Sequence, residues 1–122
     1  MQKLIFVYSA HSGNLNAYLD SLHKIVSPST YACKLCDLTY GVFREREVWK
    51  KFREENHIEM KFYHIDEFRK AYAEDSKNFN EFPFILKEEN KKLEMFLSVD
   101  ALDTLKTDQE LIGIIRTRIP VL

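Results

Sequence analysis

The sequence predicts an α/β domain in which helices flank a mixed four-stranded sheet. Two apolar or alternating runs, at residues 3–9 and 57–63, have the pattern of strands. Two further runs, at 83–87 and 92–97, flank a polar turn and predict a hairpin, after which a capped helix closes the chain. A strand–helix–strand start followed by a hairpin and a helix is typical of one mixed sheet covered by helices.

In the first half of the chain, a strand, a helix and a segment with both cysteines follow one another. A turn at residues 10–13 follows the first strand, and Ser12 or Asn14 is expected to cap the first helix. Pro28 ends this helix, because the residue before a proline avoids helical backbone. In residues 29–42 we expect a short helical turn. The apolar stripe of the first helix consists of Leu15, Tyr18, Leu19, Leu22 and Val26.

The second half is expected to contain two helices before the hairpin and one after it. A charged helix covers about residues 43–55, and a short helix capped by Asp66 follows the strand at 57–63. The polar stretch 74–80 is expected to be a loop, and a capping box at 107–110 starts the last helix. The apolar positions of these helices are Val48, Trp49, Phe52, Phe68, Tyr72, Leu111, Ile114 and Ile115.

Composition predicts a single domain over residues 1–122. Hydrophobic residues make up 45% of the chain and charged residues 30%, which is enough apolar surface for a core. Three glycines and three prolines leave little room for long linkers. The net charge is −1 and acids alternate with bases, as at residues 44–47, which is typical of a solvated helix face. We therefore expect no nucleic-acid partner.

The sequence contains no segment with the pattern of a targeting signal or a membrane span. The apolar run at residues 4–8 is too short for either role. We therefore expect a cytoplasmic protein without a membrane partner. Structural disulfides are uncommon in the cytosol, where a CxxC pair is more often redox-active, metal-binding or simply reduced.

Cys33 and Cys36 are the only cysteines and have CxxC spacing. In a redox protein, one thiolate would attack a disulfide and the other would resolve the product, with protein thiols or disulfides as partners. This hypothesis needs an exposed cysteine whose thiolate is stabilised. The neighbouring Lys34 favours a thiolate, whereas Asp37 opposes it.

Two other hypotheses for the pair stay open. Zinc is a possible cofactor, but a tetrahedral site needs two ligands besides Cys33 and Cys36. The third hypothesis is a pair of buried, reduced cysteines packed with Leu35 and Leu38. The four histidines have no recognisable ligand spacing to the cysteines; they are His11, His23, His57 and His64.

The hairpin region resembles the thioredoxin-like fold superfamily. There, a strand opened by a cis-proline leads through a hairpin to a final helix. This plan is matched by Phe82-Pro83-Phe84-Ile85-Leu86, the turn at 88–91, the strand at 93–97 and the helix at 107–118. The resemblance implies a thioredoxin-like domain with Pro83 in the cis form. The chain also resembles an uncharacterised group of small bacterial proteins, and that resemblance implies no activity.

The position of the CxxC departs from the thioredoxin pattern. Thioredoxins place it directly after the first strand, at the N-terminus of the next helix, whereas this pair follows the first helix. The family's catalytic cysteines are therefore not carried over to Cys33 and Cys36. A second candidate site lies after the first strand, where a helix N-terminus favours an anion, although an ordinary capped loop has the same pattern. It consists of His11, Ser12, Gly13 and Asn14.

The sequence thus favours a thioredoxin-like protein with thiol–disulfide redox activity at Cys33 and Cys36. The alternative is a non-catalytic binding or zinc-binding module with structural cysteines. The six steps from Ser27 to Cys33 span at most about 20 Å, which is roughly the length of the first helix. Because Pro28 favours a turn, we expect the pair to lie at the end of the sheet opposite to Pro83.

Overall fold

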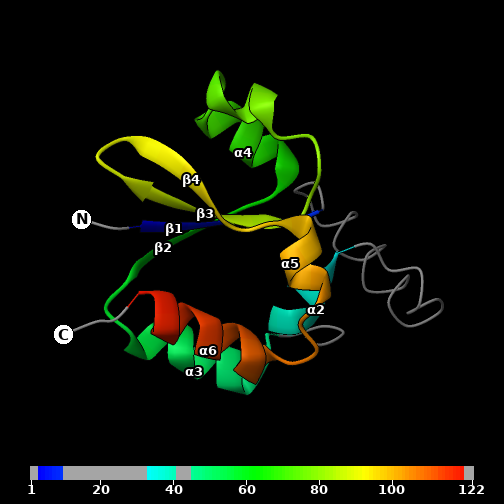
Figure 1. Cartoon of the computed structure of the whole chain (residues 1–122), viewed down its shortest axis with the longest axis vertical. Coiled ribbons are helices and arrows are strands. Elements are labelled where there is room, and N and C mark those ends of the chain that lie inside the picture. Colours follow the sequence, from blue (N-terminus) through cyan, green and yellow to red (C-terminus); the bar gives the residue numbers. More distant parts are fainter. Residues whose placement is uncertain (1–2, 10–32, 41–44, 120–122) are drawn as a thin grey trace.

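The computed structural model describes residues 3–9, 33–40 and 45–119. These residues form an α/β arrangement in which helices flank a mixed four-stranded sheet, as predicted (Figure 1). The predicted first helix lies outside the described residues. The elements are β1 (Lys3–Val7), α2 (Lys34–Thr39), α3 (Glu47–Glu55), β2 (Glu59–Tyr63), α4 (Ile65–Ala71), the 3₁₀ helix η2 (Asp75–Asn78), β3 (Phe84–Glu89), β4 (Lys92–Leu97), α5 (Val99–Asp103) and α6 (Asp108–Arg118).

The sheet has the strand order β2-β1-β3-β4. Strand β1 runs parallel to β2 and antiparallel to β3, and β3 and β4 form an antiparallel hairpin. Val7, the last residue of β1, is paired with Tyr63 on one side and with Phe84 on the other. The carboxyl ends of β1 and β2 therefore lie at the same end of the sheet as the start of β3.

The hairpin turn consists of two residues, Asn90 and Lys91, rather than the four predicted. Both have positive φ, 54° and 64°, as the central residues of a type I′ turn do. Asparagine adopts this backbone region more readily than most residues. The tight turn lengthens β3, which continues to Glu89.

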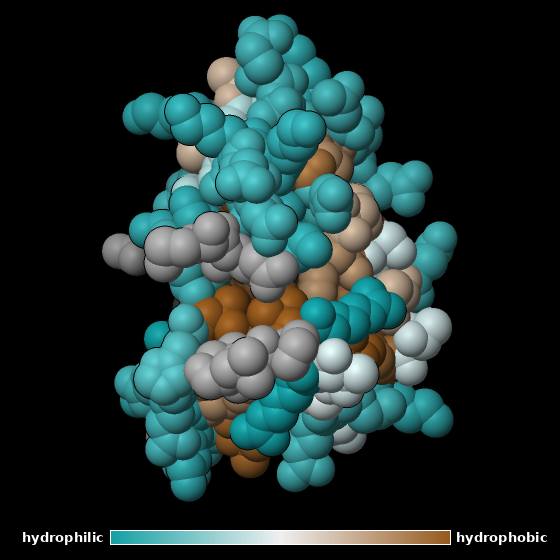
Figure 2. Space-filling model, turned by 60° about the vertical axis from the view of Figure 1, so that its left-hand side comes forward, coloured by the Kyte–Doolittle hydropathy of each residue, from teal (hydrophilic) through white to brown (hydrophobic). Residues whose placement is uncertain are grey.

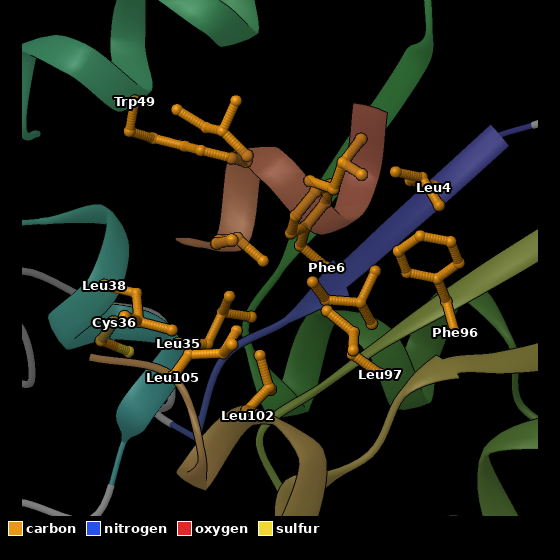
Figure 3. Close-up of a cluster of buried hydrophobic side chains, with 14 of the residues drawn as sticks. Leu4, Phe6, Leu35, Cys36, Leu38, Trp49, Phe96, Leu97, Leu102 and Leu105 are labelled. Atoms are coloured by element: carbon orange, nitrogen blue, oxygen red, sulfur yellow. The ribbon is translucent and has the colours of Figure 1, made fainter. Parts of the chain in front are cut away.

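The two faces of the sheet are covered by different helices. Leu4 and Phe6 of β1, and Tyr8 directly after it, face the larger core, whereas Ile5 and Val7 face the smaller one. The larger core includes residues of α2, α3, α5 and α6 (Figure 3). The smaller core centres on Phe68 of α4, which lies on the other side of the sheet (Figure 1). Period-two alternation thus places apolar side chains on both faces of β1.

Four local predictions for the helices were wrong. Val48 is 47% exposed, although Trp49 and Phe52 of the same helix are buried as predicted. Helix α4 is capped by His64 rather than Asp66. The stretch 74–80, predicted to be a loop, contains the 3₁₀ helix η2. Helix α5 was not predicted, because it has too few residues to show a periodic pattern. The predicted start of the last helix is confirmed, since Thr107 Oγ1 accepts a hydrogen bond from Glu110 N.

Charged side chains cover much of the surface. On the face in Figure 2, hydrophilic residues surround a patch where hydrophobic residues reach the surface. Ion pairs link neighbouring strands of the sheet, including those of Lys3 on β1 with Glu59 on β2 and Glu88 on β3. Among the described helices, none has the length and apolar character needed to cross a membrane.

We predict that Glu67→Ala destabilises the protein in a pH-dependent way. The His64 backbone N–H donates to Glu67 Oε1 at 2.8 Å, and His64 Nδ1 lies at the same distance. These hydrogen bonds, the backbone one first, lower the pKa of Glu67 from its ordinary 4.5. The carboxylate therefore stabilises the fold above pH 4.5, and this contribution is lost as the pH falls through the lowered pKa.

Thermal unfolding at several pH values measures this effect. At pH 7 the variant should lose about 0.5–1 kcal/mol, as expected for an exposed helix cap. The loss should shrink as the pH falls below 4.5. Glu74→Ala is the control, because Glu74 forms an exposed contact with Lys77, worth little. A pH-independent loss in Glu67→Ala would contradict the capping role.

Candidate functional site

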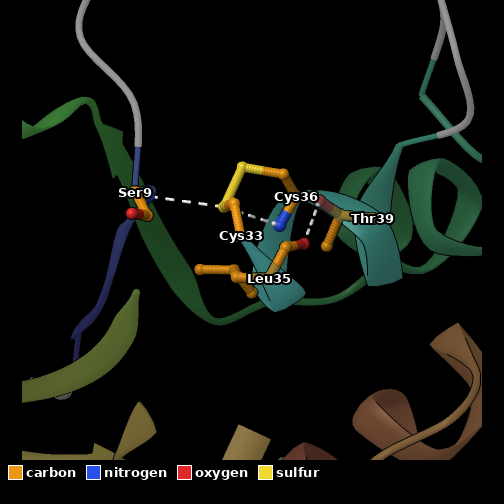
Figure 4. The surroundings of a disulfide bond; sticks show 5 residues. All are labelled: Ser9, Cys33, Leu35, Cys36 and Thr39. Carbon is orange, nitrogen blue, oxygen red and sulfur yellow. Dashed lines mark hydrogen bonds between the residues drawn. A yellow bond between two sulfur atoms is a disulfide. The ribbon is translucent and has the colours of Figure 1, made fainter. Parts of the chain in front are cut away.

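Cys33 and Cys36 form a disulfide at the start of α2 (Figure 4). Cys33 is the N-cap of this helix, and Cys36 lies in its first turn. The Cα atoms are 5.2 Å apart, because a separation of three residues brings two side chains to the same side of a helical turn. The pair is therefore oxidised, whereas the third hypothesis expected reduced thiols.

Backbone amides hold the sulfur of Cys33 in place. Cys33 Sγ accepts a hydrogen bond from Cys36 N at 3.2 Å and another from Ser9 N at 3.3 Å (Figure 4). Ser9 precedes Cys33 by 24 positions and follows the last residue of β1 by two. The N–H group at the end of β1 thus links the first strand to a residue that is distant in sequence.

This contact overturns the expectation that the cysteines lie at the end of the sheet opposite to Pro83. Pro83 immediately precedes β3, whose first residue, Phe84, pairs with Val7. Both Pro83 and Cys33 therefore lie at the carboxyl end of β1. The peptide bond from Phe82 to Pro83 is cis, as the resemblance implied. The pair lies at this end because Leu35 and Leu38 of α2 are buried in the larger core. Pro28, on whose turn preference the expectation rested, lies outside the described residues.

Both cysteines are largely buried, so neither is the exposed thiol that the redox hypothesis required. Cys33 is 2% exposed and Cys36 is 9% exposed. Leu35 and Leu38 are buried beside them, as the third hypothesis predicted. Cys36 is the more accessible residue of the pair.

The charge of Asp37, which was expected to oppose a thiolate, is paired. Arg46 Nη2 lies 3.7 Å from Asp37 Oδ1, and Arg46 Nε donates to the Asp37 backbone oxygen at 2.8 Å. The backbone N–H of Arg46 also donates to the Thr39 carbonyl. Arg46 therefore both offsets this acid and fastens the end of α2.

Tyr8 and Tyr40 lie near this end of the sheet, and both side chains are uncharged. Burial, with a smaller contribution from Glu45, raises the pKa of Tyr40. Burial, followed by the neighbouring Tyr40, also raises the pKa of Tyr8. The two rings meet edge to face with centroids 6.3 Å apart. Because both phenols stay protonated at neutral pH, they place no negative charge beside the disulfide.

The second candidate site lies outside the described part of the chain. His11, Ser12, Gly13, Asn14 and His23 lie outside it. No cluster of three or more His, Cys, Asp or Glu residues suited to a metal ion occurs among the described residues.

Sequence reasoning missed the amide of Ser9 as part of the site. A backbone donor has no signature in residue type, so only the chain path reveals it. Comparison with protein-family models, curated proteins and solved structures found no match to this chain.

We predict that Arg53→Met destabilises the region beside α2. Arg53 donates two hydrogen bonds of 2.8 Å to Glu45, whose side chain is only 13% exposed. Glu45 also forms an isolated β-bridge with Tyr40, next to the end of α2. Removing the guanidinium leaves a largely buried carboxylate without these bonds, which should cost about 1–3 kcal/mol.

Chemical denaturation measures this loss, with Lys77→Met as the matched control. Lys77 contacts Glu74 on an exposed surface, so its removal should change the free energy of unfolding by no more than about 0.5 kcal/mol. Equal effects of the two substitutions would show that the Arg53 pair contributes no more than a surface contact.

Proposed function

We propose that this protein is a thioredoxin-like thiol–disulfide redox protein and that Cys33 and Cys36 are its redox couple. The observation that carries the proposal is the position of Cys33. Its sulfur accepts a hydrogen bond from the amide that follows β1, and the residue itself caps the next described helix. Thioredoxins, by the resemblance above, also place CxxC between the first strand and a helix N-terminus.

The second half of the chain supports the same proposal. A strand preceded by a cis Phe82–Pro83 bond, a hairpin and a final helix follow in the order that the resemblance implies. Because the CxxC is distant from β1 in sequence, the catalytic roles of the thioredoxin cysteines were not assigned to it. In the fold, however, Cys33 lies next to the end of β1. Cys33 and Pro83 occupy the same end of the sheet.

The chemistry of the pair is reversible exchange. An incoming dithiol reduces the disulfide: one thiolate attacks a protein sulfur and forms a mixed disulfide, and the second thiolate then displaces the protein thiol. The dithiol leaves oxidised and the protein leaves with two thiols. Hydrogen bonds from Ser9 N and Cys36 N stabilise a thiolate at Cys33 and so favour the reduced form.

The short loop that the disulfide closes also favours a redox role over a purely structural one. By the chain-entropy relation, a four-residue loop contributes only about 2 kcal/mol, less than a long loop does. The proposed partners are proteins that carry exposed thiols or disulfides. We propose a cytoplasmic location, where such a pair would cycle between the two states.

Thiol counting and a reduction assay test this function together. Without reductant, the denatured wild type should show no free thiols, and after dithiol treatment it should show two. With a dithiol as electron source, it should accelerate the reduction of insulin disulfides. Cys33→Ser and Cys36→Ser should each abolish this acceleration, whereas Thr117→Ser on α6 should leave it unchanged. A wild type that gives no acceleration contradicts the proposal.

The burial of both sulfurs favours the second candidate, a non-catalytic module whose disulfide holds α2 in place. Thermal unfolding combined with the exchange assay separates the two functions. A structural disulfide predicts that reduction lowers the Tm by several degrees and that no exchange activity occurs.

The zinc-binding form of this alternative predicts a different result. The reduced protein would bind zinc stoichiometrically, and a chelator would unfold α2. Metal analysis of the reduced protein, followed by circular dichroism with and without chelator, measures both quantities. Wild-type activity that survives complete metal removal favours the redox function over this form.

A further inference from the structure

The two sulfurs of the disulfide differ in their surroundings. The hydrogen bonds that reach the disulfide from the described residues both end on Cys33, one from Ser9 N and one from Cys36 N (Figure 4). Cys33 is also the more deeply buried of the two, at 2% exposed against 9% for Cys36. Hydrogen bonding therefore singles out Cys33, whereas the greater residue exposure belongs to Cys36.

This asymmetry bears directly on disulfide exchange. The rate of exchange depends on access to the attacked sulfur and on how stable the departing thiolate is. Amide N–H groups aimed at a sulfur stabilise negative charge on it. When the S–S bond breaks, charge that develops on Cys33 Sγ is met by two donors already in position, so no reorganisation is needed at that moment.

We infer that Cys36 is the sulfur that exchanges with external thiols and that Cys33 is the buried leaving and resolving thiolate. The inference rests on the proposed redox function and specifies which cysteine reacts with the external thiol. An external thiolate attacks Cys36 Sγ, the bond between the two protein sulfurs breaks, and Cys33 leaves as a thiolate. A second thiolate then attacks the mixed disulfide and releases Cys36, so that one dithiol is oxidised for each protein disulfide reduced.

The reverse reaction follows the same path. A reduced protein accepts a disulfide partner at Cys36, and the Cys33 thiolate resolves the mixed disulfide. The second cysteine of the motif therefore faces the partner, and the first, held against the end of β1, closes the cycle.

The sequence between the cysteines allows a direct test on the wild type. Lys34 separates Cys33 from Cys36, so trypsin places them in different peptides, residues 25–34 and 35–44. The oxidised protein is mixed briefly with glutathione, quenched with acid, alkylated with N-ethylmaleimide and digested. Mass spectrometry then locates the glutathione and the alkyl group.

We expect glutathione on the 35–44 peptide and the alkyl group on the 25–34 peptide, with about a tenfold preference or more. Glutathione mainly on the 25–34 peptide, or equally on both, overturns the inference while leaving the redox function intact. If neither peptide is modified and a dithiol also fails to reduce the folded protein, the proposed function itself fails.

The two serine variants give an independent readout. With oxidised glutathione, reduced Cys33→Ser should accumulate a stable mixed disulfide on Cys36, because the resolving thiol is gone. Reduced Cys36→Ser should form its mixed disulfide about tenfold more slowly or worse, since Cys33 is held in the core. Equal rates, or faster reaction of Cys36→Ser, overturn the assignment. Circular dichroism of both variants confirms that each is folded before rates are compared.

Discussion

The burial of β1 on both faces is the constraint on which the rest of the structure depends. As a central strand, it pairs with β2 and β3 and contributes side chains to both cores. Leu4, Ile5, Phe6 and Val7 are all fully buried. The backbone N–H and C=O groups of such a strand form hydrogen bonds to the neighbouring strands until the strand ends. Its first amides beyond the paired region are therefore the donors that the end of the sheet offers.

Those amides are used in two different ways. Tyr8 N donates to Tyr63 O and so extends the pairing with β2 by one residue. Ser9 N donates to Cys33 Sγ instead. A sulfur is a weaker acceptor than a carbonyl oxygen, but the contact fixes α2 against the end of the strand, and Leu35 and Leu38 of that helix then fill the larger core. The same packing that stabilises the domain thus positions the disulfide.

How far the sequence predicted this arrangement depends on the range of the interaction involved. All four strands were predicted from period-two or apolar runs, and the capped start of α6 was predicted from Thr107 and Glu110. The sequence did not predict the length of the hairpin turn, the exposure of Val48 or helix α5. Each of these depends on tertiary context or on very few residues. The cysteines were identified from their spacing. Their location was not predicted, because it depends on contacts that are distant in sequence: the packing of Leu35 and Leu38 in the larger core and the hydrogen bond from Ser9 N, 24 positions away.

Burial of a disulfide and reactivity toward external thiols make opposite demands, and the proposed redox function assigns them to different cysteines. Among the described residues, two backbone amides face the Cys33 sulfur, Asp37 is paired with Arg46, and the nearby tyrosines are neutral. Fixed dipoles stabilise a developing thiolate without the desolvation cost of a buried cation. Cys36 retains the residual exposure. In this proposal, a CxxC pair is part of the hydrophobic core and still exchanges, provided that the attacked cysteine is the more exposed residue of the pair.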